Sequence, residues 1–189
     1  MSELQEPVLS IRHLTTEFAL PSGNGKAVDD LSFEILKGET LGIVGESGCG
    51  KSMTALSILN LVPSPPGNIS SGEIYFEDKN LLEFDDRQMR EVRGKDISMI
   101  FQEPMTSLNP VLTIGYQIEE VIQKHLGLSK ADARKKTTTL LELVKIPEAE
   151  KRAMQFPHQL SGGMRQRAMI AMALSCEQRY SSLTSRLQR

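Results

Sequence analysis

Residues 45–52 read GESGCGKS, and the strongest indication of the fold comes from this stretch. It matches the P-loop pattern G-x-x-x-x-G-K-[ST], whose backbone N–H groups surround phosphate oxygens. The apolar run ETLGIV at 39–44 predicts a strand before the loop, and apolar residues at helical spacing over 51–62 predict a helix after it. A strand, a glycine-rich loop and a helix are the setting that a phosphate-binding loop needs, so the sequence predicts an α/β P-loop fold.

The residue types within this loop suit a nucleoside triphosphate bound with Mg²⁺. The glycines allow backbone conformations and a close approach that a Cβ would block. Lys51 would place its ammonium on the β- and γ-phosphates, and the Ser52 hydroxyl would ligate Mg²⁺. A glycine-rich turn with a chance lysine is the alternative, and the loop leaves kinases, GTPases and transport ATPases open. The predicted nucleotide-binding residues here are Gly45, Glu46, Ser47, Gly48, Cys49, Gly50, Lys51, Ser52 and Met53.

Hydrophobic patterning divides the rest of the chain into a strand-rich part and a helical part. Alternating residues predict a pair of strands around the turn-rich PSGNG at 21–25, followed by two more strands that flank a charged helix. The region beyond Pro110 fits helices, the second of which Ser129 could cap. The predicted strands are 8–18, 26–36, 72–76 and 96–101, and the predicted helices are 86–93 and those between 113 and 146.

The 22 Lys and Arg residues nearly balance the 24 Asp and Glu residues, which gives a formal net charge of −2. This balance argues against nucleic acid as a partner, because proteins that bind it by bulk charge carry an excess of positive residues. No apolar run reaches the roughly 18 residues of a spanning helix, and the acidic start is unlike a secretory signal. We therefore expect any work at a membrane to go through a partner.

A second motif, LSGGMRQR at 160–167, comes before the apolar segment AMIAMAL. A serine and two glycines at a helix start can bind phosphate, although taken alone the segment fits an ordinary N-cap equally well. Together with GESGCGKS it resembles the signature of the ABC transporter ATPases. The segments FQEPMTSLNPVLTIGYQI at 101–118 and FPHQLSGGMRQRAMIAMAL at 156–174 resemble the ATP-binding subunits of oligopeptide and dipeptide ABC importers, and the similarity extends over about residues 8–177.

This resemblance implies ATP and Mg²⁺ as ligands and assigns roles to further residues. Lys51 and Gln102 would be catalytic, and Gln102 would sense Mg²⁺ and the γ-phosphate and link them to membrane subunits. The implied Mg²⁺ ligands are Ser52 and Gln102. Phe18 would stack on adenine, although a phenylalanine at a strand end equally fits ordinary core. The signature residues that would complete the ATP site of a partner subunit are Ser161, Gly162, Gly163 and Gln166.

The resemblance also implies domains and partners. The fold would be an ABC ATPase core with an antiparallel β subdomain and a helical subdomain, incomplete at the C-terminus. The strand-rich ATP-binding core would cover about 8–102, and the helical subdomain with the signature about 103–177. The partners would be a second ABC ATPase subunit in a head-to-tail dimer, two transmembrane permease subunits and an extracytoplasmic solute-binding protein. Such a subunit would lie peripherally on the cytoplasmic face of a bacterial inner membrane.

The family's acid-bearing strand, which ends in LLIADEPT, and its later switch histidine are missing after the signature helix. The chain instead ends in RYSSLTSRLQR at 179–189, which contains no acidic residue. A permitted choice of codons for this tail, read from the third base of the Arg179 codon, spells LLIADEPTAT. We therefore expect a one-base deletion near codon 179, an out-of-frame tail at 180–189, the loss of a strand of the parallel sheet, and defective hydrolysis.

Three functions remain open from the sequence. The first is the energy-coupling subunit of a peptide importer, with nickel or glutathione as alternative cargo because related subunits serve these. The second is a non-hydrolysing structural or regulatory partner that lends its signature residues to an intact ATPase. The third is an unrelated P-loop enzyme such as a small-molecule kinase, which would leave LSGGMRQR and the 101–118 segment unexplained.

Overall fold

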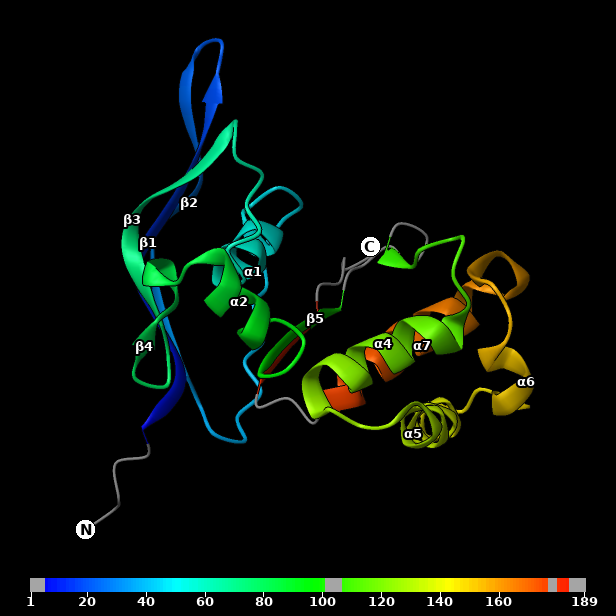
Figure 1. The fold of residues 1–189 in the computed structure, drawn as a ribbon. Helices are drawn as coiled ribbons and strands as arrows, with labels where there is room; N and C mark the ends of the chain where they lie inside the picture. Colours follow the sequence, from blue (N-terminus) through cyan, green and yellow to red (C-terminus); the bar gives the residue numbers. More distant parts are fainter. Residues whose placement is uncertain (1–5, 101–106, 177–179, 184–189) are drawn as a thin grey trace. The chain divides into compact units, whose positions relative to one another are not determined.

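The computed structural model describes residues 6–100, 107–176 and 180–183. The chain forms two compact units, Met1–Arg90 and Glu91–Arg189. Strands dominate the described part of the first unit, and helices dominate that of the second (Figure 1). The expected combination of an antiparallel β subdomain with a helical subdomain is therefore confirmed, while the boundary near residue 102 stays a prediction.

The first unit is built on a four-stranded antiparallel sheet with the strand order β2–β1–β3–β4. The predicted hairpin is confirmed, and Leu20 pairs with Gly23 across Pro21 and Ser22. The hairpin strands are longer than the hydrophobic alternation predicts, because the ladder continues through the polar residues beside the turn. The strands are β1 (Pro7–Leu20), β2 (Gly23–Leu36), β3 (Gly67–Phe76) and β4 (Lys79–Asn80).

The predicted strand at 39–44 is not formed. These residues pair with no described strand, and Leu41, Ile43 and Val44 are 40%, 48% and 78% exposed. A strand requires a neighbour for its backbone N–H and C=O groups, and the sheet of this unit ends at β2 and β4 without taking up this segment. Glu39 instead closes a turn after β2, since its Oε2 accepts a hydrogen bond from the Leu36 N–H at 2.8 Å.

Helix α1 (Lys51–Ile58) follows the loop as predicted, but it ends before residue 62. Asn60 takes a left-handed φ of 49°, a conformation that asparagine tolerates and that ends helices. A buried hydroxyl pair ties α1 to the sheet, because Thr16 Oγ1 on β1 lies 2.9 Å from Ser57 Oγ. Both residues are 0% exposed, so this contact fixes how α1 lies on β1.

Helix α2 (Asp86–Val92) confirms the predicted charged helix and follows the short turn η1 (Leu81–Glu83). Its start is closed by a reciprocal pair: Gln88 N–H donates to Asp85 Oδ1 at 2.7 Å, and Asp85 N–H donates to Gln88 Oε1 at 2.9 Å. Met89 is 0% exposed and anchors the helix in the core of the unit.

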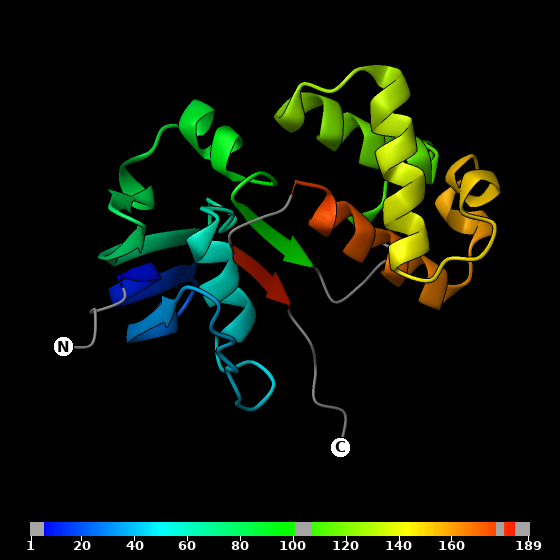
Figure 2. The same cartoon turned by 90° about the horizontal axis from the view of Figure 1, so that it is seen from below.

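The second unit contains a parallel pair of strands, β5 (Ile97–Ile100) and β6 (Tyr180–Leu183), which lie side by side in Figure 2. Strand β5 confirms the strand predicted at 96–101, within the described residues. Strand β6 corrects the expectation that the tail leaves no strand at this place. Ladder hydrogen bonds join main-chain groups, so a segment without an apolar pattern can still pair with β5. The frameshift stays a hypothesis.

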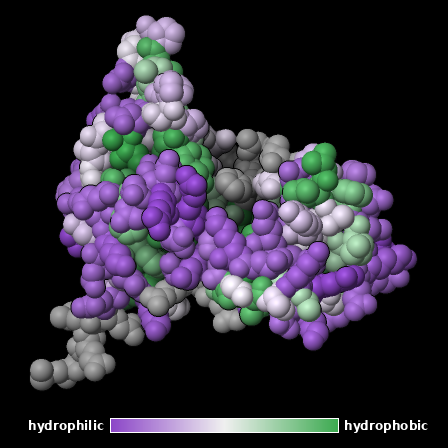
Figure 3. Space-filling view, viewed as in Figure 1, coloured by the Kyte–Doolittle hydropathy of each residue, from purple (hydrophilic) through white to green (hydrophobic). Residues whose placement is uncertain are grey.

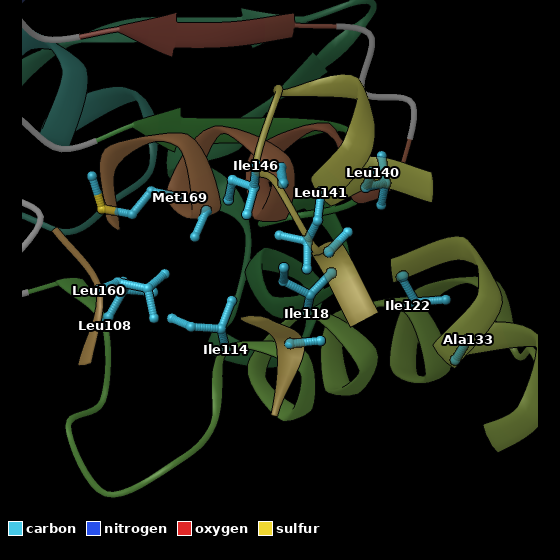
Figure 4. Close-up of a cluster of buried hydrophobic side chains, with 14 residues drawn as sticks. Leu108, Ile114, Ile118, Ile122, Ala133, Leu140, Leu141, Ile146, Leu160 and Met169 are labelled. Carbon is cyan, nitrogen blue, oxygen red and sulfur yellow. The ribbon is translucent and has the colours of Figure 1, made fainter. Parts of the chain in front are cut away.

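The helices of the second unit surround one apolar core (Figure 4). Ile114, Ile118 and Ile122 follow the helical spacing along one face of α4 and are at most 1% exposed, which confirms the helix predicted through Ile118. The elements are α4 (Ile114–Leu126), α5 (Lys130–Leu143), α6 (Ala149–Ala153), η2 (Pro157–Gln159), α7 (Gly162–Ala173) and η3 (Leu174–Cys176).

Side-chain caps fix where two of these helices begin. Thr113 Oγ1 accepts a hydrogen bond from Tyr116 N–H at 3.3 Å, and Ser129 Oγ accepts one from Asp132 N–H at 3.2 Å. The predicted cap at Ser129 is therefore confirmed. Gly127 ends α4 with a left-handed φ of 64°, as glycine commonly does after a helix.

We expect the stability of the second unit to fall in mild acid because of His125 on α4. Burial, with a smaller effect of Lys124, lowers the pKa of this imidazole below its ordinary value of 6.5. Lys95 also lowers it, whereas Glu91 and Asp96 raise it. The unfolded chain then takes up a proton that the folded chain resists, so stability is complete above pH 6.5 and falls as the pH drops below it.

Urea unfolding of the chain and of a His125→Gln variant at pH 7.5 and 5.5 checks this expectation. The unaltered chain should lose more stability between the two pH values than the variant. Equal losses would mean that other groups cause the acid sensitivity.

The surface seen in Figure 3 is mainly hydrophilic, with separate hydrophobic patches. Among the described residues, no helix combines the length and the apolar character needed to cross a membrane. Separate apolar side chains are ordinary on a protein surface.

Candidate nucleotide-binding site

The P-loop contains two glycines in a left-handed conformation. Gly48 and Gly50 have φ values of 88° and 93°, which side chains with a Cβ rarely adopt. Gly50 also lies against β2, so that a Cβ there would collide with the carbonyl oxygen of Ala27. The backbone conformation therefore requires glycine at both positions. At Gly50 the close packing on β2 is an independent second reason for glycine.

The Lys51 ammonium points back onto the loop. Its Nζ donates hydrogen bonds to the carbonyl oxygens of Gly45 at 2.7 Å and Glu46 at 2.6 Å, and lies 3.3 Å from Cys49 Sγ. Phosphate oxygens are stronger acceptors for an ammonium than neutral carbonyl groups are. A phosphate bound in this loop can therefore take over the hydrogen bonds of Lys51.

Helix α1 begins without a side-chain cap, because its N-cap residue is Gly50. The first N–H groups of a helix have no partner within the helix, and the positive end of the helix dipole favours an anion beside them. Ser52 is exposed in this first turn, and Met53 is half-buried. The start of α1 therefore has the features of a phosphate site.

The metal that fits this site is one held mainly by oxygen atoms. No cluster of three or more His, Cys, Asp or Glu side chains that could hold a metal occurs in the described ranges. Mg²⁺ is commonly bound by one or two protein oxygens together with substrate phosphates. The exposed Ser52 hydroxyl beside Lys51 is an oxygen donor of that kind, so it fits Mg²⁺ bound with a nucleotide.

Two other residues were predicted to bind the nucleotide, Phe18 and Gln102. Phe18 is half-buried near the end of β1, opposite Gly25 on β2 and Gly67 on β3. Its Cε1 lies 3.0 Å from where a Cβ on Gly67 would be, so the ring covers that glycine. Adenine stacking by Phe18 stays a prediction. Gln102 lies outside the described residues, and its role stays a prediction as well.

Ser161 is the N-cap of α7 and begins the signature segment. Its Oγ accepts a hydrogen bond from Met164 N–H at 3.3 Å. Gly162, Gly163 and Gln166 are exposed. A Cβ on Gly163 would meet nothing within 4 Å, and neither glycine has a left-handed φ. Neither packing nor backbone conformation requires these glycines, which leave the start of α7 open to another molecule.

The P-loop lies in the first unit and the signature in the second. Sequence reasoning missed the residues that support them: the Ala27 carbonyl, the Thr16–Ser57 pair and Arg165, whose Nη1 donates to the Leu160 carbonyl at 3.0 Å. No sequence pattern marks a backbone carbonyl or a buried hydroxyl pair. The position of Arg165 could have been noticed in the sequence, because the helix dipole disfavours a cation near a helix N-terminus and such a residue needs a compensating contact.

A glycine-rich loop, an ammonium held on it and an uncapped helix define a P-loop nucleotide-binding protein of the α/β class. The family model described as ABC transporter matches residues 28–183, and the chain belongs to this family.

Several curated relatives have about half of their residues in common with this chain over the matched region. The dipeptide transport ATP-binding protein DppD of Bacillus subtilis is 51% identical over 172 residues, which are 91% of this chain and 51% of that protein. The oligopeptide transport ATP-binding protein OppD of Salmonella typhimurium is 48% identical over 169 residues, which are 89% of this chain and 50% of that protein. The chain spans about half the length of these curated relatives. The predicted resemblance to dipeptide and oligopeptide importer subunits is confirmed.

Solved structures show the same fold. A dimeric post-hydrolysis state of the ATP-binding cassette MJ0796 bound to ADP and Pi has a TM-score of 0.79 at 28% identity, covering 90% of this chain and 70% of that one. The cbiO1 protein of Clostridium perfringens, part of the ABC transporter complex cbiONQ, has a TM-score of 0.70 at 23% identity, covering 94% and 65%. The predicted ABC ATPase fold is therefore confirmed.

Proposed function

We propose that this chain is an ATP-binding, energy-coupling subunit of an ABC transporter that imports peptides. The observation that carries the proposal is the P-loop, in which Lys51 is held on Gly45 and Glu46 at the head of an uncapped helix. The names of the relatives, which are dipeptide and oligopeptide transport ATP-binding proteins, support peptides as cargo. Nickel and glutathione are the alternative cargoes.

The proposed ligands are ATP and Mg²⁺. The N–H groups of residues 45–52 bind phosphate oxygens, and Lys51 exchanges its carbonyl acceptors for oxygens of the β- and γ-phosphates. Ser52 holds Mg²⁺, which when bound offsets the negative charge of the phosphates. Gln102 is proposed as a second Mg²⁺ ligand, and Phe18 as the ring that stacks on adenine.

The proposed partner at the ATP site is a second ABC ATPase subunit in a head-to-tail dimer. Ser161, Gly162 and Gly163, with Gln166, complete the site of that subunit from outside. The exposed start of α7 and the dimeric form of the similar cassette support this arrangement. Two transmembrane permease subunits and a solute-binding protein complete the proposed importer, with the ATPase subunits on the cytoplasmic face of the inner membrane.

Hydrolysis is proposed to be defective in this chain. Water attack on the γ-phosphate requires an acidic residue at the metal and a group that orients the water. Residues 178–189, which stand where the family has its acid-bearing strand, contain no acidic residue. A second candidate function, that of a non-hydrolysing partner for an intact ATPase, is favoured by the signature glycines, which the fold of the chain itself does not require.

We expect the purified chain to bind MgATP and to release phosphate no faster than a buffer control. The reason is that the P-loop residues are present, while residues 178–189 contain no acidic residue. Titration with a fluorescent ATP analogue, with and without Mg²⁺, measures binding, and a phosphate-release assay measures hydrolysis. Absence of binding would overturn the proposed function. Mg²⁺-dependent phosphate release that is lost in Lys51→Ala would overturn the proposed defect.

Mixing experiments separate the candidate functions. Faster turnover by an intact importer ATPase on addition of this chain would favour the non-hydrolysing partner. Phosphate transfer to an added small-molecule acceptor would instead favour the kinase alternative.

A further inference from the structure

Helix α7 carries an arginine near its start, where the helix dipole disfavours a cation. Arg165 Nη1 donates hydrogen bonds to the carbonyl oxygens of Leu160 at 3.0 Å and Pro157 at 3.3 Å. Both carbonyl groups belong to the turn that leads into Ser161. Hydrogen bonds from a charged donor are stronger than neutral ones, so this contact offsets the unfavourable dipole.

Further hydrogen bonds close the same turn. Gln159 Oε1 accepts from Phe156 N–H at 2.9 Å, and Gln159 N–H donates to the Phe156 carbonyl at 2.9 Å. Leu160 N–H donates to the Pro157 carbonyl at 3.2 Å. The rings of Phe156 and His158 stack with their centroids 5.6 Å apart. The turn is therefore fixed by hydrogen bonds between Phe156 and Gln159 within it and by the Arg165 side chain on α7.

The turn is also continuous with the start of α7. Leu160 is only 4% exposed and belongs to the apolar core of the helices. The next residue, Ser161, accepts a hydrogen bond from Met164 N–H on Oγ at 3.3 Å, and from Arg165 N–H on its carbonyl at 2.9 Å. Arg165 therefore donates to two consecutive carbonyl groups, with its side chain to that of Leu160 and with its main-chain N–H to that of Ser161.

The hydrogen bonds that the Arg165 side chain makes within the described residues go to carbonyl groups of the turn. Its Nη1 serves two carbonyl groups, and its Nε is buried without a hydrogen-bond partner in the described part of the chain. Its Nη2 lies 3.9 Å from where a Cβ on Gly162 would be, which places it beside the signature segment. We propose that Arg165 is a positioning residue, which fixes the turn 157–160 so that residues 161–163 keep one geometry for a phosphate of the nucleotide bound by a partner subunit. This inference rests on the proposed function of the signature.

The test compares Arg165→Ala and Arg165→Lys with a matched control, Arg167→Ala. Arg167 lies on the same helix and also donates to a backbone carbonyl, that of Lys145 at 2.7 Å, but it has no hydrogen bond to the turn. Without nucleotide, hydrogen exchange of the main-chain amides at positions 164 and 165, corrected for the intrinsic rate of each residue type, should become about tenfold faster in Arg165→Ala. It should recover in part in Arg165→Lys and stay unchanged in Arg167→Ala. A residue that acted only on a phosphate would leave these exchange rates unchanged, and that result would overturn the proposal.

A second measurement tests the consequence for the partner site. MgATP-dependent association of the chain, followed by sedimentation, should be about tenfold weaker in Arg165→Ala than in Arg167→Ala. The affinity of the P-loop of the chain for ATP should be equal in the two variants. Faster exchange with unchanged association would overturn positioning and leave Arg165 a purely structural residue. Absence of association in the unaltered chain would overturn the proposed pairing of subunits. The exchange rates would still decide whether the Arg165 side chain stabilises the turn.

Discussion

Gly50→Ala is expected to abolish MgATP binding and to destabilise the first unit by about 3 kcal/mol or more. Two costs add at this position. The φ of 93° is unfavourable for any residue with a Cβ, and that Cβ would collide with the Ala27 carbonyl oxygen on β2. Either α1 or β2 must then move, and the loop loses the geometry that directs its N–H groups at phosphate. ATP titration and urea unfolding of the variant measure the two effects.

Two other glycines provide matched controls for the free energy of unfolding. Gly48→Ala meets only the conformational cost, since φ is 88° but no atom lies within 4 Å of the added Cβ, and it should lose about 1 kcal/mol. Gly163→Ala meets neither cost and should change stability by no more than about 0.5 kcal/mol. If Gly48→Ala destabilises as much as Gly50→Ala, the contact with Ala27 is not what requires glycine.

Lys51→Ala is expected to weaken MgATP binding about 100-fold, or by about 3 kcal/mol, with little change in the free energy of unfolding. The ammonium is the charged donor nearest the proposed phosphates, whereas the carbonyl groups that it now binds belong to the exposed residues Gly45 and Glu46 and can be solvated without it. Titration with a fluorescent ATP analogue measures the affinity, and urea unfolding measures the stability.

The matched control for Lys51 is Lys37→Ala, which removes an exposed lysine of the same unit from outside the loop. Its affinity for MgATP should equal that of the unaltered chain. Lys51→Arg should recover little, because a planar guanidinium does not fit where a compact ammonium binds the loop. Affinity kept within about twofold in Lys51→Ala would mean that the backbone alone holds the phosphates.

Features with a local cause were predictable from the sequence. The hairpin of β1 and β2, the cap at Ser129 and the buried face of α4 each follow from residues close together in the chain. The P-loop pattern is predictable for the same reason, because all of its residues lie within 45–52. The P-loop and helix α1 could be predicted because their residues lie next to one another in the sequence.

Features that depend on a distant partner were not predictable. Residues 39–44 have the composition of a buried strand but pair with no strand in the described part of the chain. Strand β6 lacks such a composition and pairs with β5 through its main chain. Within the site, Thr16 and Ser57 meet across 41 residues of sequence. No spacing rule connects residues so far apart, and only the folded chain reveals the contact.

The unpaired segment at 41–44 has a consequence for how the protein behaves in solution. Its sequence, LGIV, is short, apolar and prone to β structure, which is the kind of stretch that joins copies of a protein into aggregates when it is exposed. The charged residues Lys37, Glu39 and Glu46 stand on either side of it, and charges in such positions act as gatekeepers because an aggregate would have to bury them. The charges of these three residues therefore help to keep copies of the chain apart at high concentration.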